Sequence, residues 1–446
     1  MSPVSPAADP RESSEEISRG YANYVLGALF VAYILNFVDR QVLSVLLVPI
    51  QTELQVSDTA MGLLTGLAFA LFYTFAGIPI ARWADRGTRR SIIAIGFVVW
   101  SVMTAVSGLA RSYAELALAR MGVGVGEATF GPAAQSLISD YFPPERRATA
   151  LAIFTIGANV GTLVGLIGGG YLNDLFGWRT AFLVVGLPGV LFALVFRLTV
   201  REPRRGLAEG IVVAPSSDST WDVLRYLMVR SSFVYLAAAA ALHGFAGYGA
   251  GAWTPAFMIR VHGLSPGQAG LALGLVSGVF AALGAYLGGK LSDGLGRRDV
   301  RWNMWVPAFG SVLAFPFSYL FLLWPDTLPA LAFLVPSAIF GAFWVGPTYA
   351  MTQGLARPHM RALAVAILLF ILNLIGMGLG PLFVGVLNDV LEPRLGIEAV
   401  RYSLLIVAVP HVLAAVFNLL AARTLRADLV QPANSTSTPG GAVSGA

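Results

Sequence analysis

The chain has 446 residues, of which 56% are hydrophobic and 12% are charged, with a formal net charge of +5 and no cysteine. A soluble domain carries about 25% charged residues, so this composition excludes a protein that water surrounds on all sides. The missing cysteines exclude disulfides and thiol chemistry. The first twenty residues are polar and lack the apolar core of a signal peptide, and we expect a disordered tail over 1–20.

Twelve apolar runs of about 20 residues follow, each long enough to cross about 30 Å of hydrocarbon as an α-helix. They centre near Asn36, Leu71, Val99, Gly126, Gly161, Val190, Phe245, Val279, Val312, Phe340, Leu374 and Val412. A polar linker over 201–230 separates the two sets of six, and its segment 221–228 has the pattern of an interfacial helix. The sequence predicts an all-α membrane protein with two six-helix bundles, 21–200 and 231–426, and a disordered tail over 427–446.

The basic residues orient these twelve helices. With the N-terminus inside, five arginines fall on the outer side and two lie within helices, which leaves 22 of the 29 Lys and Arg residues on the inner side. This excess predicts that both termini are cytoplasmic. Because the basic residues lie in short loops between apolar runs, we expect no nucleic-acid partner. Short outer loops without an Asn-x-Ser/Thr sequon favour a bacterial inner membrane.

The two halves of the sequence repeat each other. Residues 85–90 (DRGTRR) follow the second apolar run, and residues 293–298 (DGLGRR) follow the eighth. The motif Leu-Asn-Asp ends the fifth run at 172–174 and the eleventh at 387–389. Parallel repeats of six helices are typical of transporters, which hold their substrate between the halves near the middle of the membrane.

Four ionisable residues lie deep within the first and fourth runs. Asp39 and Arg40 are adjacent, and Arg120 and Glu127 share a helix face two turns apart. Each costs at least about 2.5–3.5 kcal/mol to place in hydrocarbon, so we expect one cluster, with Asn36 on the face of Arg40. The carboxyls of Asp39 and Glu127 are candidates for proton coupling, and the guanidiniums are candidates for binding a phosphate or carboxylate. A purely structural ion pair stays open.

The second half has no acid within its predicted spans. Its seventh and tenth helices carry aromatic and polar side chains, which suit the tail of an amphiphile better than a sugar. For each of these residues a packing role stays open. With one tyrosine from the first helix, the candidate cavity residues are Tyr33, His243, Tyr248, Trp253, Phe340, Trp344, Thr348 and Tyr349.

These motifs resemble those of a known family. Residues 85–90, with Gly77 before them, resemble the loop signature between helices 2 and 3 of the major facilitator superfamily, and 289–298 is a second copy. Residues 120–127 resemble its helix 4 signature. The segments 36–40 (NFVDR) and 126–128 (GEA) are most similar to the Spinster branch, whose members export sphingosine-1-phosphate, lysophospholipids and related amphiphiles. Gly87 and Thr88 depart from the usual loop signature, which has a bulky residue followed by glycine.

The resemblance implies a cytoplasmic gate that alternates between open and closed states. Its implied residues are Asp85, Arg86, Arg89, Arg90, Asp293, Arg297 and Arg298. In the closed state Asp85 is expected to bind the start of helix 11, near Arg357 and Arg361.

We therefore expect a monomeric secondary transporter that moves a lysophospholipid or sphingoid-type amphiphile and is coupled to protons. No ATP-binding motif, metal-ligand cluster or cofactor motif is visible. One alternative is a carrier of a small organic anion or drug. Another is a membrane receptor that binds its ligand without moving it. No nucleophile–base pair indicates an enzyme.

Overall fold

The computed structural model describes residues 18–203 and 219–429. It leaves out five side chains within the helix Phe69–Arg86, those of residues 78, 81, 82, 85 and 86. Most of the predicted N-terminal tail, the middle of the predicted linker and the C-terminal tail beyond residue 429 lie outside these described residues. Within them, nine helical stretches are long and apolar enough to cross a membrane. Two of these stretches, Pro144–Thr199 and Pro358–Asp428, each hold two crossings, and α6 (Tyr113–Glu127) with α7 (Gly131–Tyr141) adds one. The described chain therefore has the twelve crossings that the sequence predicts.

The first half is built from eight α-helices and one short π-helix. They are α1 (Arg19–Val45), α2 (Leu47–Leu54), α3 (Asp58–Leu63), η1 (Leu64–Ala68), α4 (Phe69–Arg86), α5 (Arg89–Ser107), α6 (Tyr113–Glu127), α7 (Gly131–Tyr141) and α8 (Pro144–Thr199). Within α8 the chain reverses between the fifth and sixth crossings at Gly177, whose φ of 78° suits only a residue without a side chain.

The second half contains the remaining helices. They are α9 (Thr220–Met228), α10 (Ser231–Arg260), α11 (Pro266–Leu275), η2 (Val276–Phe280), α12 (Ala281–Gly296), α13 (Trp302–Leu323), α14 (Thr327–Gly341), α15 (Val345–Leu355), η3 (Pro358–Met360), α16 (Arg361–Ile371), η4 (Leu372–Leu379), α17 (Gly380–Leu395), η5 (Gly396–Glu398) and α18 (Ala399–Asp428). The short helix α9 covers the segment predicted to be interfacial. It buries Val223 and Leu227 beside α16 and leaves Trp221 exposed.

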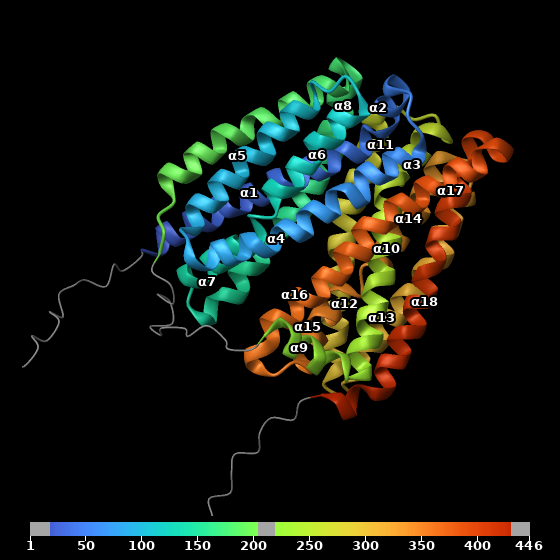
Figure 1. Ribbon diagram of the computed structural model, residues 1–446. Helices are drawn as coiled ribbons and strands as arrows, with labels where there is room; N and C mark the ends of the chain where they lie inside the picture. The colour runs from blue at the N-terminus through green and yellow to red at the C-terminus, as the bar shows by residue number, and fades with distance from the viewer. Residues whose placement is uncertain (1–17, 204–218, 430–446) are drawn as a thin grey trace, which may run out of the picture.

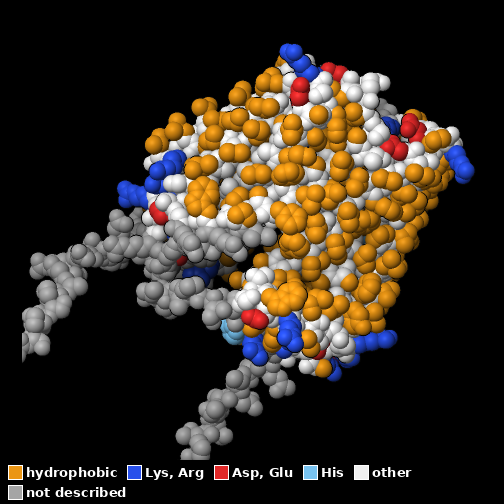
Figure 2. Space-filling model, in the orientation of Figure 1, with side chains coloured by type: hydrophobic (Ala, Val, Ile, Leu, Met, Phe, Trp, Pro, Cys, Tyr) orange, Lys and Arg blue, Asp and Glu red, His pale blue; other side chains and the backbone are white. Residues whose placement is uncertain are grey.

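The two halves form two bundles that lie side by side (Figure 1). Both ends of the described chain lie on one side of the molecule, which we call the terminal side; the opposite side is the distal side. The bundles meet at the distal side, where α3 packs against α17 and α8 packs against α11. Hydrophobic side chains cover the flank between the two sides, and charged side chains gather at the ends (Figure 2). This distribution is that of a protein embedded in a bilayer.

Glycines allow the two bundles to approach backbone to backbone. A Cβ atom on Gly270 of α11 would collide with the carbonyl oxygen of Leu166 in α8, and one on Gly66 of η1 would collide with the carbonyl oxygen of Gly378 in η4. Small residues at such crossings are the usual way to bring helices together in lipid, where no hydrophobic force drives them. The distal contact between the halves therefore depends on backbone proximity.

An ion-paired residue at the start of α5 binds the terminal side of the first bundle together. Arg89 is 1% exposed and donates hydrogen bonds to Glu202 at 2.8 Å, to Ser136 at 2.8 Å and to the carbonyl oxygen of Pro203 at 3.3 Å. It also pairs with Asp140. All four partners belong to the first half, so in this conformation Arg89 joins α5 to α7 and to the chain that follows α8.

A similar anchor fixes the last helix of the second bundle. Hydrogen bonds from Arg301 lower the pKa of the Asp299 carboxyl to about 2. The guanidinium of Arg426, near the end of α18, lies 2.8 Å from the same carboxylate. The end of α18 is thereby held beside the start of α13.

We expect Arg89→Ala to destabilise the protein, because the change removes the cation that Asp140 and Glu202 share. Loss of one partner from a buried ion pair costs about 3–5 kcal/mol. Arg297→Ala is the matched control, since Arg297 occupies the repeated position in the second half and is exposed. Thermal unfolding of the purified proteins in detergent measures the effect. Equal melting temperatures for the two variants would contradict this role of Arg89.

Candidate functional site

The structure joins the first and fourth crossings through a buried ion pair. The Arg40 Nε lies 2.6 Å from the Glu127 Oε2, and the Glu127 side chain has no exposed area. The guanidinium of Arg40 also lies over the rings of Phe37, Phe69 and Tyr73, at 5.4, 5.2 and 4.9 Å from their centroids. The cation is therefore held by one carboxylate and three aromatic faces.

The other two ionisable residues of this cluster keep polar atoms without partners. Asp39 and Arg120 are 3% and 2% exposed. The Arg120 Nη2 is 3.5 Å from the backbone carbonyl oxygen of Asp39. The Asp39 Oδ1, the Arg120 Nε and Nη1, the Glu127 Oε1 and the Asn36 Nδ2 have no hydrogen-bond partner. Buried polar groups normally have one, so this cluster has unused capacity to bind a ligand or a proton.

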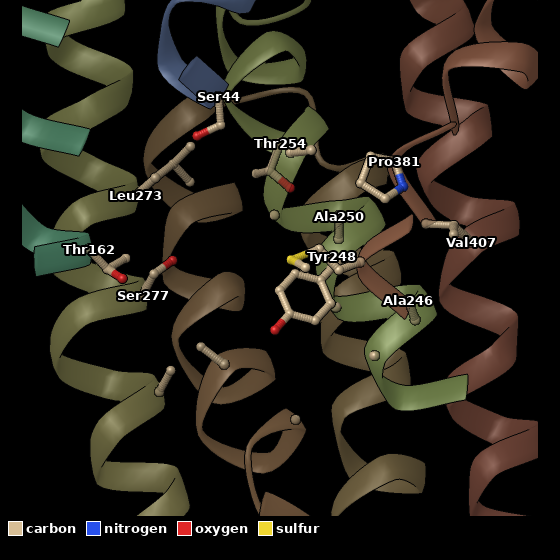
Figure 3. Close-up of a pocket in the computed structure, with 18 of the residues that line it drawn as sticks. Ser44, Thr162, Ala246, Tyr248, Ala250, Thr254, Leu273, Ser277, Pro381 and Val407 are labelled. Carbon is tan, nitrogen blue, oxygen red and sulfur yellow. The ribbon is translucent and has the colours of Figure 1, made fainter. Parts of the chain in front are cut away.

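A cavity of about 650 Å³ lies between the two bundles. Arg40 and Arg120 line it from the first half. From the second half, four of the predicted cavity residues line it: His243, Tyr248, Trp344 and Tyr349. Tyr248 projects from α10 into the space that Thr162 and Ser277 border on another side (Figure 3). The cavity thus has a cationic wall on one bundle and an aromatic wall on the other.

Four other predicted cavity residues lie outside this lining: Tyr33, Trp253, Phe340 and Thr348. Tyr33 stacks on Phe154 with a centroid distance of 4.4 Å. The Trp253 Nε1 donates to the carbonyl oxygen of Pro381 at 2.9 Å. Phe340 packs against Phe343, and Thr348 is 2% exposed. Tyr33 and Trp253 contact neighbouring helices, which shows that an aromatic residue in a membrane helix can serve packing as well as a cavity.

Sequence reasoning missed the small polar residues of the cavity. Hydroxyl groups line it at Ser44, Thr65, Thr162, Ser277, Ser318 and Ser337, and His411 lines it from α18. A single Ser, Thr or His within an apolar run forms no pattern that marks it out. These groups became visible only when the helices were placed around the cavity.

The distal side of the cavity is closed by a carboxylate of the second half that binds a helix of the first. The Asp389 carboxylate, in α17, accepts hydrogen bonds from the backbone N–H groups of Asp58 at 3.0 Å and Thr59 at 2.8 Å. These are unsatisfied donors at the start of α3, where the helix dipole also favours a negative charge. Asp389 therefore caps a helix of the opposite bundle.

The same arrangement occurs with the two halves exchanged. The Asp174 carboxylate, in α8, accepts from the backbone N–H of Gly267 at 2.9 Å and from the hydroxyl of Ser265 at 2.6 Å. These donors lie at the start of α11 in the second bundle. The two repeats of the Leu-Asn-Asp motif thus place equivalent carboxylates in equivalent contacts across the molecule. The repeat was visible in the sequence, but its role was not.

An ion pair completes the distal closure. Arg260 of α10 donates to both carboxylate oxygens of Asp58, at 2.6 and 2.8 Å. Asn388 donates to the same carboxylate at 2.8 Å, and Gln51 contacts both Arg260 and Asp58. Residues from both bundles therefore share one polar network on the distal side.

The residues predicted to form a gate lie on the terminal side. The Arg90 backbone N–H donates to Glu202 at 2.8 Å and its guanidinium to the carbonyl oxygen of Val200 at 3.1 Å, so it lies within the first bundle like Arg89. Asp293, Arg297 and Arg298 are exposed at the end of α12. The side chains of Asp85 and Arg86 lie outside the described part of the chain. Their function as a gate stays a prediction.

The sequence matches the model of the Major Facilitator Superfamily over residues 29–381. The chain belongs to this superfamily. An MFS-type efflux pump of Mycolicibacterium smegmatis is 36% identical, over 92% of this chain and 94% of that protein. Protein spinster homolog 1 of Rattus norvegicus is 29% identical, over 84% of this chain and 74% of the relative.

A solved structure shows the same fold. The crystal structure of a bacterial homolog to the human lysosomal transporter Spinster, in an inward-facing and unoccupied conformation, is 35% identical with a TM-score of 0.86. The match covers 93% of this chain and all of the other. These comparisons confirm the predicted fold and the resemblance to the Spinster branch. The protein is an integral membrane transporter of that branch and not an enzyme.

We expect Asp174→Asn and Asp389→Asn to loosen the distal closure, most of all in combination. Each change removes a charge that favours only the conformation in which the opposite helix start is capped. One pair of spin labels is placed at the distal ends of α3 and α17, and a second pair at the distal turn of α8 and the distal end of α11. The distance between the labels of each pair measures the effect. Asp326→Asn, an exposed distal residue outside this network, is the control. Distance distributions identical to wild type in the double variant would rule out these caps as a closure.

Proposed function

We propose that this transporter moves an amphiphile with an anionic head, a lysophospholipid or sphingoid-type lipid, by proton-coupled alternating access. The observation that carries this proposal is Arg120. Its guanidinium is buried, lines the cavity and has two nitrogens without a hydrogen-bond partner. An oxygen of a phosphate or carboxylate would accept a hydrogen bond from either of these nitrogens.

The rest of the cavity lining favours binding of an apolar tail over binding of a second charged group. Its wall on the second bundle holds Tyr248, Trp344 and Tyr349 among aliphatic side chains such as Leu372 and Val407. Its volume of about 650 Å³ falls in the range of sites that bind molecules of this size. A sugar would place hydroxyl groups against this apolar surface without hydrogen-bond partners.

Proton coupling rests on Asp39 and Glu127. Both carboxyls are buried beside the arginines that would hold the head group, and each has one oxygen without a partner. A proton on either carboxyl changes the net charge of the cluster by one unit. Binding of an anion at Arg120 and loss of a proton at Asp39 or Glu127 therefore oppose each other. In alternating access, the cluster would exchange protons and anions first with one side of the membrane and then with the other.

The basic residues support cytoplasmic termini in a bacterial inner membrane. With that orientation, the conformation described above is closed on the outer side. The proposed cytoplasmic gate, Asp85 with Arg86 and the exposed cluster at the end of α12, would close in the opposite state. We propose that the protein works as a monomer, because each chain holds a complete cavity between its own two bundles.

A carrier of a small organic anion or drug is the second candidate. The similarity to an MFS-type efflux pump favours it, and a guanidinium in the cavity suits any anion. Purified protein in liposomes, offered a lysophospholipid, a sugar acid and a cationic dye in turn, tests both candidates. Uptake or release of the lysophospholipid alone supports the lipid proposal. Movement of only the sugar acid or the dye contradicts it, and binding without movement indicates a receptor.

We expect Arg120→Gln to reduce binding of a phosphate-headed lysolipid at least tenfold, because hydrogen bonds to a charged group contribute about 1.5–3 kcal/mol. Binding of a neutral monoacylglycerol should change much less, since its head carries no anion. Arg111→Gln, an exposed distal arginine, is the control. Titration calorimetry in nanodiscs gives both affinities. Equal losses for the charged and neutral lipids would contradict recognition of the head by Arg120.

We expect Asp39→Asn combined with Glu127→Gln to abolish accumulation driven by a pH gradient, while exchange of substrate at equal pH persists. The variant carboxamides imitate permanently protonated carboxyls, and exchange needs no proton release. A purely structural pair predicts a different result: removal of the Glu127 charge leaves Arg40 buried without its partner, at a cost of about 3–5 kcal/mol. Melting temperature, exchange and accumulation would then fall together. A folded double variant that still accumulates substrate uphill would contradict the coupling proposal.

A further inference from the structure

Two imidazoles with partnerless nitrogens lie on the wall of the cavity formed by the second bundle. His243 of α10 is 3% exposed, and its Nδ1 has no hydrogen-bond partner. His411 of α18 also lines the cavity, and its Nδ1 likewise has none. The centroids of the two rings are 5.5 Å apart. They form a compact polar pair on a wall that is otherwise largely apolar.

The neighbours of His243 hold its ring but leave one edge without a partner. Its Nε2 lies 3.4 Å from both the Ser311 Oγ and the Asn418 Nδ2, which are long contacts. The Ser311 hydroxyl donates its own proton to the carbonyl oxygen of Pro307 at 2.8 Å. The ring of Trp344 lies parallel to the imidazole, with a centroid distance of 5.0 Å and an interplanar angle of 3°. The orientation of His243 is thereby fixed, and its buried Nδ1 stays without a partner.

Packing alone does not account for this pair. A polar group inside a membrane protein costs free energy unless it finds a hydrogen-bond partner. A leucine or phenylalanine would fill the same space at either position without that cost. The chain instead places two imidazoles next to each other, and each keeps a nitrogen without a partner. Among the described residues no third metal-ligating side chain joins them.

We propose that His243 and His411 form a second polar subsite, which binds a hydroxyl group on the head of the substrate while Arg120 binds its anionic group. A hydroxyl both donates and accepts hydrogen bonds, so it can bridge the two imidazoles when at least one of the two Nδ1 atoms carries a proton. A phosphate or carboxylate only accepts, and the buried guanidinium on the other bundle is the stronger site for it. The inference rests on the proposed function and narrows its substrate class to amphiphiles with both an anionic group and a hydroxyl.

This arrangement also links recognition to transport. Arg120 belongs to the first bundle, and the histidine pair belongs to the second. A head group that carries both functions would contact both bundles at once. A lipid without the hydroxyl would contact only one polar wall.

Paired lipid probes test the subsite. The probes are 1-oleoyl lysophosphatidic acid, which has a phosphate and a free hydroxyl at C2, and its 2-deoxy analogue, in which hydrogen replaces that hydroxyl. Affinities are measured by calorimetry on the full-length protein in nanodiscs. Wild type should bind the hydroxyl lipid about tenfold more tightly, because the deoxy lipid leaves the imidazoles without hydrogen-bond partners. His243→Gln and His411→Phe should each reduce that preference toward one, mainly by weakening binding of the hydroxyl lipid.

The controls separate this inference from the proposed function. His262→Gln, which lies outside the cavity lining, should keep the wild-type preference. If wild type binds neither probe, the proposal of an anionic head is wrong, and the proposed subsite is wrong as well. If wild type binds both probes equally, the subsite is wrong while the proposed function stands. Equal loss of both probes in the two histidine variants, with a lower melting temperature, would show that the pair is structural. If His243→Gln does not fold, His411→Phe still tests the subsite, because His411 is less buried.

Discussion

The ion pair between Arg40 and Glu127 joins two crossings inside a bundle that is surrounded by hydrocarbon. Hydrocarbon cannot solvate a charge, so each charged group in the bundle must find its partner within the protein. Glu127 and three aromatic rings satisfy Arg40, but Arg120 beside them keeps donors without acceptors. The free energy of the buried guanidinium therefore depends on what enters the cavity, which supports the proposal that the cluster is a binding site and not only a structural ion pair.

Part of the distal closure is more exposed to water than this buried cluster. Asp174 is exposed, and its hydrogen bonds to the start of α11 can be replaced by bonds to water. Asp389 makes the equivalent contact with the start of α3. Contacts of this kind cost little to break and re-form, which suits an interface that must open in each transport cycle. The repeat of the sequence thus supplies two equivalent halves of one closure.

Much of the fold could be predicted because length and hydropathy leave few alternatives in a membrane. The charged cluster was also visible, since Asp39, Arg40, Arg120 and Glu127 stand out in apolar runs and helix geometry fixes their depth. Helix rotation was harder to predict: Trp253 faces α17 rather than the cavity, whereas Trp344 lines it. A single residue such as His411 carries no periodic signal. The partners of Asp174 and Asp389 depend on the positions of helices more than 90 residues away along the chain.

The π-helical segments were not predictable either. The segments η1 and η2 lie in the second and eighth crossings, and η4 lies in the eleventh. Such segments differ from α-helix by one residue per turn and often occur at functional sites. Their sequences are rich in leucine, valine and glycine, and their hydropathy is like that of the helices around them. Only the backbone reveals them, at the helices that line the contact between the two bundles.

A cryo-electron microscopy map of the protein with a bound phosphate-headed lysolipid tests the central claim most directly. The account predicts head-group density within hydrogen-bond distance of the Arg120 Nε or Nη1, with the acyl tail along the wall that contains Tyr248 and Trp344. Density for the tail against Arg120, or for the phosphate away from both Arg40 and Arg120, would contradict it.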